Sequence, residues 1–181
     1  MPLFNLVKVY GADVAKVLAP GERLLAMGYI HTHMPHDTSG MEPPESRRFI
    51  EGVSWRGVHV NKIHFFRWLF GSAGNGPPGS WGHRVWQMIR DAGAQNINPD
   101  WAVTDQRLLF LNREGDDAVH FRVLHDVPRS AIRGVRRRGK LFIQWGRCEV
   151  TFVDGSTVML TLTAFDLGAP RLFMRALSST H

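Results

Sequence analysis

The sequence predicts a mainly β fold with antiparallel strands, and three observations support that prediction. Between Trp101 and Thr163, segments of high strand propensity alternate with short turns, and helical periodicity is almost absent. Within this region, Asp154-Gly155 separates two strand-forming runs, a strong short signal for a two-residue hairpin turn. Beyond it, apolar residues recur at helical spacing. We therefore expect a sheet followed by a C-terminal helix.

The composition is that of a folded protein with a basic surface. The chain has 181 residues, of which 44% are hydrophobic and 21% charged, which is enough for one domain with its own core over residues 1–181. The net charge of +6 indicates that any charged partner is acidic: nucleic acid, anionic lipid or an acidic protein surface. The single cysteine, Cys148, excludes an internal disulfide and fits a reducing compartment.

The first 30 residues predict a weakly amphipathic segment, a turn and a strand. Val14, Val17 and Leu18 share one side, and Pro20-Gly21 marks the turn before a strand within residues 22–30. No charged segment followed by an apolar one indicates a signal peptide, and no apolar run approaches the roughly 20 residues that span a bilayer. We expect a cytoplasmic protein, with a peripheral position at the inner face of the membrane left open.

Residues 31–99 read as a large insertion of irregular composition. Residues 71–79 are dominated by glycine and proline, which predicts a flexible segment. Ser80 is a good N-cap for a helix from Trp81 to about Asp91, and Gly93 is a stop signal. The insertion is therefore expected to carry a second helix.

The sheet continues through residues 101–163, and the C-terminal helix is expected over residues 167–179. Between Thr157 and Thr163 the residues alternate in polarity: Val158, Leu160 and Leu162 fall on one face and threonines on the other. This alternation predicts one buried and one wet face.

In these features the chain resembles the bacterial pleckstrin-homology-like and GRAM-like domains. The resembling pieces are Pro20-Gly21-Glu22 before a strand, Trp101 to Arg107 before an apolar strand, Val127 to Ile132, and the Asp154-Gly155-Ser156 hairpin before an amphipathic helix. The resemblance implies a bent antiparallel barrel of about seven strands, closed at one end by the C-terminal helix. It also implies a mostly non-enzymatic domain that binds lipid headgroups, peptides or other subunits. It does not cover the insertion.

A basic segment is the main candidate for a binding site. Between residues 129 and 147 there are seven cations before the first acid, and residues 136–140 read as the tip of a hairpin. Guanidinium groups bind phosphate and carboxylate in a bidentate manner, so the segment predicts an acidic partner; the alternative is a solvated turn. The candidate ligand-binding residues are Arg129, Arg133, Arg136, Arg137, Arg138 and Lys140.

Two further segments in the insertion carry residues with functional potential. The aromatic residues Phe65, Phe66 and Trp68, with Arg67 between them, predict either a membrane or partner contact or a piece of buried core. His31, His33 and His36 are nitrogen donors of the kind that zinc prefers, although their composition favours a polar loop over a metal site. They are the candidate metal ligands.

These patterns favour a non-catalytic binding or adaptor module without a cofactor. Its expected partner is an acidic protein surface or anionic membrane lipid, and homo-oligomers are left open. One alternative is a metal-dependent hydrolase that uses the three histidines, although their spacing departs from known hydrolase motifs and no later ligands follow. Another is a nucleic-acid-binding protein, disfavoured because no helix-turn-helix or RNA-recognition signature is present.

Overall fold

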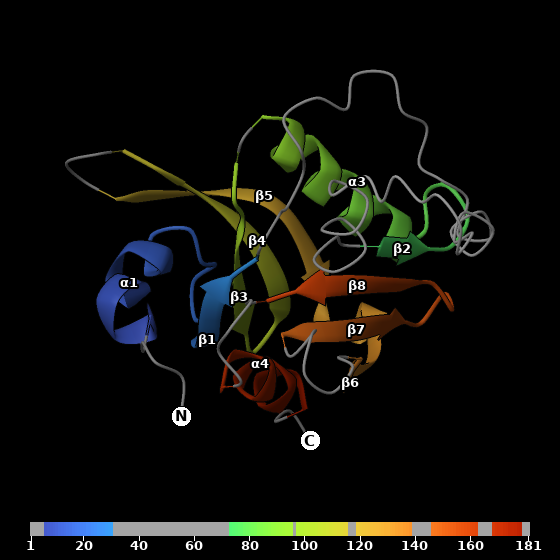
Figure 1. Cartoon of the computed structure of the whole chain (residues 1–181). Helices are drawn as coiled ribbons and strands as arrows, with labels where there is room; N and C mark the ends of the chain where they lie inside the picture. The colour runs from blue at the N-terminus through green and yellow to red at the C-terminus, as the bar shows by residue number, and fades with distance from the viewer. Residues whose placement is uncertain are drawn as a thin grey trace, which may run out of the picture.

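Two antiparallel four-stranded sheets form the centre of the structure (Figure 1). The computed structural model of the chain describes residues 6–30, 73–95, 97–115, 119–138, 146–162 and 168–178. Within these residues the fold is mixed α and β, with eight strands and three α-helices.

The order of the strands divides the chain between the two sheets. The first sheet contains, in spatial order, β1 (Leu24–Tyr29), β3 (Asp100–Thr104), β4 (Arg107–Glu114) and β5 (His120–Pro128). The second contains β2 (Ala73–Asn75), β8 (Thr157–Thr161), β7 (Arg147–Phe152) and β6 (Ile132–Arg137). A short 3₁₀ turn, Arg129–Ala131, leads directly from β5 into β6 and so connects the sheets. Seven of these strands lie outside the predicted insertion, and β2 is an eighth from within it.

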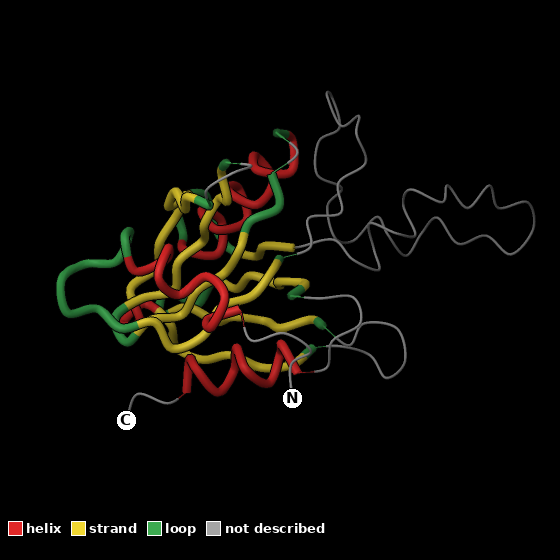
Figure 2. Tube along the Cα trace, turned by 90° about the vertical axis from the view of Figure 1, so that its left-hand side faces the viewer, coloured by secondary structure: helices red, strands yellow, loops and turns green. Residues whose placement is uncertain are grey.

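The main core lies between the two sheets. Trp101 and Phe110 of the first sheet pack with Phe152 and Leu160 of the second, and all four are 0% exposed. The helices α3 (Trp81–Ala94) and α4 (Gly168–Ser178) lie at opposite ends of the strands (Figures 1 and 2). Both helices contribute side chains to this core, α3 through Val85 and α4 through Phe173. The sheets and these two helices therefore share one apolar interior.

The outer face of the first sheet is covered by α1 (Leu6–Ala15). Figure 2 shows α1 in front of the strands, and Val14 of this helix packs with Ala102 and Leu109. Because β3 has side chains buried on both faces, all five of its residues are buried. The weak amphipathic signal near the N-terminus thus corresponds to a helix that makes a second, smaller core.

The N-terminus of α3 is held by the hairpin between β7 and β8. Asp154 accepts a hydrogen bond of 2.8 Å from the Trp81 backbone N–H, and the Ser156 hydroxyl accepts one of 2.8 Å from that of Gly82. Ser80 caps the helix as predicted, since its hydroxyl accepts from the His83 N–H. A Cβ at Gly82 would lie 2.6 Å from the Thr157 carbonyl oxygen, so this position requires glycine.

Two sequence predictions about the second sheet are wrong in detail. The β7–β8 hairpin has a three-residue loop rather than a two-residue turn, because the Phe152 N–H donates to the Ser156 carbonyl and the Gly155 N–H to that of Phe152. Gly155 is the last residue of this loop and has a positive φ of 81°. Residues 73–75, predicted to be flexible, pair with β8 instead. Gly74 permits this pairing, since a Cβ there would lie 2.6 Å from that of Trp86.

The alternation in β8 is confirmed on its apolar face. Val158 and Leu160 are 0% exposed, and Leu162 follows at 1%. The opposite face is not uniformly exposed to solvent. Thr161 of β8 is buried, and so is Glu149 of the neighbouring strand β7. The predicted C-terminal helix over residues 167–179 is confirmed as α4. No α-helix in the described residues is long and apolar enough to cross a bilayer.

Candidate binding surface on strand β6

Strand β6 and the residue after it carry four of the predicted basic residues. Arg136 and Arg137 belong to the strand itself and not to a hairpin tip, because they pair with Glu149 and Cys148 of β7. Four of the predicted arginines have exposed side chains here, on both faces of the strand, because Arg136 lies on the face of Glu149 and Arg137 on that of the buried Cys148. We call this set the β6 arginine cluster: Arg133, Arg136, Arg137 and Arg138.

Within the cluster, one carboxylate serves two arginines. The Nε atoms of Arg136 and Arg138 donate to Glu149 over 2.6 and 2.9 Å, respectively. Burial alone would raise the pKa of Glu149, but the hydrogen bonds from both arginines outweigh that effect and lower the pKa. Glu149 is therefore a buried anion that orients two exposed guanidinium groups side by side.

The other two arginines of the cluster have no such carboxylate. In the described part of the chain no acidic oxygen lies within ion-pair distance of Arg133 or Arg137. The cluster as a whole thus carries four positive charges against one negative charge. This excess is what an acidic ligand requires.

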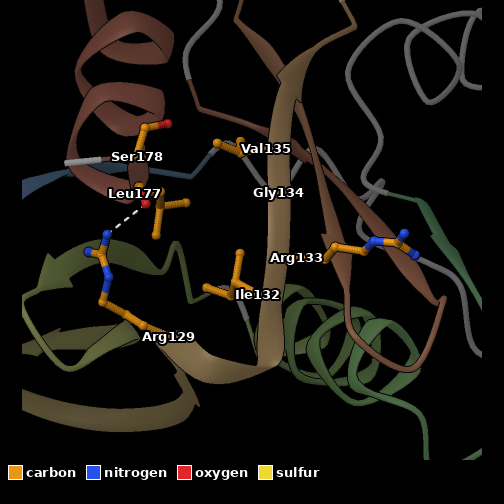
Figure 3. Close-up of a pocket in the computed structure, with 7 residues that line it drawn as sticks. All are labelled: Arg129, Ile132, Arg133, Gly134, Val135, Leu177 and Ser178. Atoms are coloured by element: carbon orange, nitrogen blue, oxygen red, sulfur yellow. Dashed lines mark hydrogen bonds between the residues drawn. The ribbon is translucent and has the colours of Figure 1, made fainter. Parts of the chain in front are cut away.

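A pocket of about 210 Å³ lies between β6 and the end of α4 (Figure 3). Ile132, Val135 and Leu177 form apolar walls, while Arg133 points to the other side of the strand. We call it the β6–α4 pocket. Its volume is below the roughly 300–1,000 Å³ typical of small-molecule sites. A pocket of this size fits a side chain of a partner better than a cofactor. Its lining is Arg129, Ile132, Arg133, Gly134, Val135, Leu177 and Ser178.

Arg129 serves a different purpose from the one predicted. Its guanidinium group donates to the carbonyl oxygens of Thr104, Ala176 and Leu177 over 2.9, 2.9 and 2.6 Å. Two of these carbonyls belong to the last turn of α4, whose acceptors have no partners within the helix. Burial lowers the pKa of Arg129 below its usual value, and Asp105 partly opposes that effect. Arg129 therefore caps α4 and forms one end of the pocket, and it is not part of the cluster.

The other predicted site residues lie outside the described residues. This applies to one candidate ligand-binding residue, to the aromatic segment and to the candidate metal ligands: Lys140; Phe65, Phe66, Arg67 and Trp68; His31, His33 and His36. Among the described residues, no group of three or more histidine, cysteine, aspartate or glutamate side chains is arranged to hold a metal ion.

Few reactive side chains lie near the β6–α4 pocket in the described part of the chain. The lining of the β6–α4 pocket contains no carboxylate, histidine or cysteine that would act as a base or nucleophile. Burial raises the pKa of Cys148 to about 12, and its side chain is fully buried. Reactive cysteines have a lowered pKa and are accessible, so Cys148 is a core residue.

Three contributors to this surface escaped the sequence analysis. Glu149 and Leu177 come from other elements, so no local pattern connects them with β6. Val135 could have been found, because an apolar residue between arginines in a strand indicates that its side chain lies on a less exposed face. Comparison with known proteins adds no assignment: no protein-family model, no curated protein and no solved structure matches this chain.

Proposed function

We propose that this protein is a non-catalytic binding module that recognises an acidic segment of a protein partner through the β6 arginine cluster. The single observation that carries the proposal is the unbalanced charge of the cluster: of its four exposed arginines, only Arg136 and Arg138 contact a carboxylate, that of Glu149. Arginine forms strong bidentate hydrogen bonds with carboxylates, and its guanidinium is more weakly hydrated than an ammonium. The cluster is therefore well suited to aspartate and glutamate side chains.

The adjacent pocket supports a protein partner over an anionic membrane. Interfaces between proteins commonly place one apolar side chain in a pocket and surround it with polar contacts. The β6–α4 pocket has apolar walls next to the arginines and is too small for most small-molecule ligands. A surface that docks on headgroups through charge alone has no need of such a pocket.

We further propose that the fold belongs to the pleckstrin-homology-like class that the sequence resembles. Seven strands outside the insertion, divided between two antiparallel sheets, and a C-terminal helix at one end of the shared core support this proposal. A bent barrel is the corresponding description of the two sheets. Solving an experimental structure and comparing the order of its strands and the position of its C-terminal helix with those of the class tests it.

A binding measurement with defined probes tests the proposed function. The full chain is titrated against fluorescent peptides rich in glutamate and against matched peptides with glutamine in place of glutamate. We expect binding to the glutamate peptides only, and weaker binding at higher salt because exposed charges are screened. The variant R133A/R136A/R137A should lose at least about tenfold in affinity, which corresponds to about 1.4 kcal/mol.

A matched variant separates local recognition from net charge. R84A/R90A/R122A removes the same number of positive charges from exposed positions on α3 and β5, and we expect it to keep most of the affinity. Equal losses in the two variants would contradict the proposal. Binding to vesicles of anionic phospholipid without binding to any glutamate peptide would also overturn it, in favour of a membrane ligand.

A further inference from the structure

We propose that the acidic segment binds as an added β-strand along the outer edge of β6, with alternating acidic and apolar side chains. This inference rests on the proposed function and specifies its ligand. The expected pattern is acidic, apolar, acidic: the acidic residues lie on the face of Arg136 and Arg138, and the apolar residue between them enters the β6–α4 pocket. Four features of the structure lead to this pattern.

The first feature is the position of β6 at the end of its sheet. In the described residues β6 has one strand neighbour, β7, and its second edge faces the space beside α4. Edge strands present unpaired backbone N–H and C=O groups, which another chain can complete as a further strand.

The second feature is how the pocket is lined. Residues 132–135 are consecutive, and all four line it. Side chains of consecutive strand residues point to opposite faces, so they cannot all reach one pocket. Arg133 indeed points away from α4 (Figure 3). The pocket therefore runs along the backbone edge of β6, where an added strand would lie. The space beside Gly134 is open, because a Cβ there would meet no atom within 4 Å.

The third feature is the direction of the backbone groups. The Arg138 N–H donates to the Arg147 carbonyl of β7 over 3.1 Å. Successive residues of a strand direct their polar groups to alternate edges. Val135 and Arg137 therefore direct their N–H and C=O groups away from β7, towards the open edge. An added strand would pair with these two residues.

The fourth feature is the division of side chains between the two faces of β6. Val135 pairs with Val150, which is 0% exposed in the core, so Val135 lies on the inner face beside the pocket. Arg136 pairs with Glu149 and so lies on the opposite face, whereas Arg137 pairs with the buried Cys148 and lies on the same face as Val135. An added strand has the same alternation, which places every second side chain beside Arg136 and Arg138 and the intervening ones at the pocket.

Two isomeric peptides test the pattern. One alternates glutamate and leucine, and the other has the same composition with the two residues in separate blocks. We expect the alternating peptide to bind the full chain at least about tenfold more tightly. N-methylation of its backbone should then weaken binding at every second position, because alternate N–H groups face β6. Equal affinity for both isomers, or equal tolerance of N-methylation at all positions, would overturn strand addition and leave the proposed function standing.

A protein variant provides an independent check. V135P removes the backbone N–H that would pair with the added strand, and it leaves the hydrogen bonds between β6 and β7 in place. V135T changes the same side chain but keeps the N–H, so it is the control. We expect V135P alone to lose at least about tenfold in affinity for the alternating peptide. Unchanged affinity in a folded V135P would overturn the inference; if V135P does not fold, the N-methylation series decides. Failure of both peptide isomers to bind the wild type would overturn the proposed function as well.

Discussion

The arginines of β4 and those of β6 are the same residue type in opposite situations. On β4, Arg107 and Arg113 each have a buried carboxylate of their own: the side chain of Glu22 is 0% exposed and that of Asp100 is 2% exposed. On and beside β6 there are four exposed arginines and one buried carboxylate, Glu149, which contacts only Arg136 and Arg138. The ratio of carboxylates to guanidinium groups thus separates arginines that hold the fold together from arginines that remain available to a ligand.

The pair Arg107–Glu22 illustrates the structural use. Two guanidinium nitrogens of Arg107 donate to the two carboxylate oxygens of Glu22, each over 2.9 Å, and the Thr104 hydroxyl donates to the same carboxylate over 2.7 Å. The hydrogen bond from Arg107 lowers the pKa of Glu22 to about 2. This network joins the loop before β1 to the turn between β3 and β4.

Arg113 shows a second structural use, in which aromatic rings replace water. Its guanidinium carbon lies 4.4 Å from the ring centroid of Tyr10 and 5.2 Å from that of Tyr29, and Nη2 donates to Asp100 over 2.9 Å. Tyr10 belongs to α1, so Arg113 helps to hold this helix on the sheet. Few of its donors are left for a partner.

The largest expected effect comes from removing an ion pair of β4, that of Arg107 with Glu22. R107M leaves the buried Glu22 carboxylate without its charged partner, which should cost about 3–5 kcal/mol of unfolding free energy. R133M on β6 should change that free energy by no more than about 0.5 kcal/mol, because it alters an exposed side chain. Chemical denaturation of both variants measures the difference. Similar losses in the two variants would show that the β6 arginines are also structural.

The next effect concerns Arg129, which the sequence placed with the ligand-binding arginines. R129M removes three hydrogen bonds to carbonyls from a charged donor, and we expect a loss of about 2–3 kcal/mol. Hydrogen exchange should increase first in the last turn of α4, because two of those carbonyls belong to it. Unchanged protection of α4 would contradict its role as a helix cap.

A third effect is the pH dependence that Asp100 imposes. Burial raises the pKa of Asp100 from 3.8 to about 6, although the charge of Arg113 and its hydrogen bond lower it. The folded protein therefore binds this proton more tightly than the unfolded chain. The resulting stabilisation is present below about pH 4 and is lost as the pH rises through about 6, by an amount on the order of 3 kcal/mol.

Two variants check the sign of that dependence. D100N should remove the decline in unfolding free energy between pH 4 and 6, relative to the wild type. In the wild type, the lowered pKa of Glu22 provides stabilisation that is present above about pH 4.5 and is lost as the pH falls towards 2. E22Q should remove this second dependence, which lies at lower pH and has the opposite sign to that of Asp100. An unchanged slope in D100N would show that Asp100 titrates normally.

The smallest expected effect sharpens the β6 side of the comparison. E149Q removes the one negative charge in the cluster, so the alternating peptide should bind about two- to threefold more tightly at low salt. The stability should change by less than about 1 kcal/mol, because both arginine partners of Glu149 are exposed. Weaker binding in E149Q would show instead that Glu149 is needed to orient Arg136 and Arg138.

Local signals in the sequence were sufficient for several elements. The Ser80 cap, the hairpin around Asp154 and the spacing of apolar residues in α4 each depend on a few neighbouring residues, and each predicted an element that the structure contains. The basic segment was also found, because charge is visible without knowledge of the fold. The three-residue β2 was missed, because its glycines weaken any strand signal.

What the sequence could not provide is the pairing of distant residues. Arg129 and Arg133 look alike in the sequence, but Arg129 meets the carbonyl of Leu177, 48 positions away. Glu22 and Arg107 are 85 positions apart. These contacts decide which arginines are occupied, and they follow from how the two sheets and the helices pack.

The most direct test of this account is the accessibility of each arginine to chemical modification. Phenylglyoxal treatment of the full chain, read by mass spectrometry with and without the alternating peptide, compares all of them in one experiment. We expect rapid modification of Arg133 and Arg137 that the peptide suppresses, and slow modification of Arg107 and Arg113 that it does not change. Equal reactivity on the two strands, or no protection of β6 by bound peptide, would contradict the distinction between structural and available arginines.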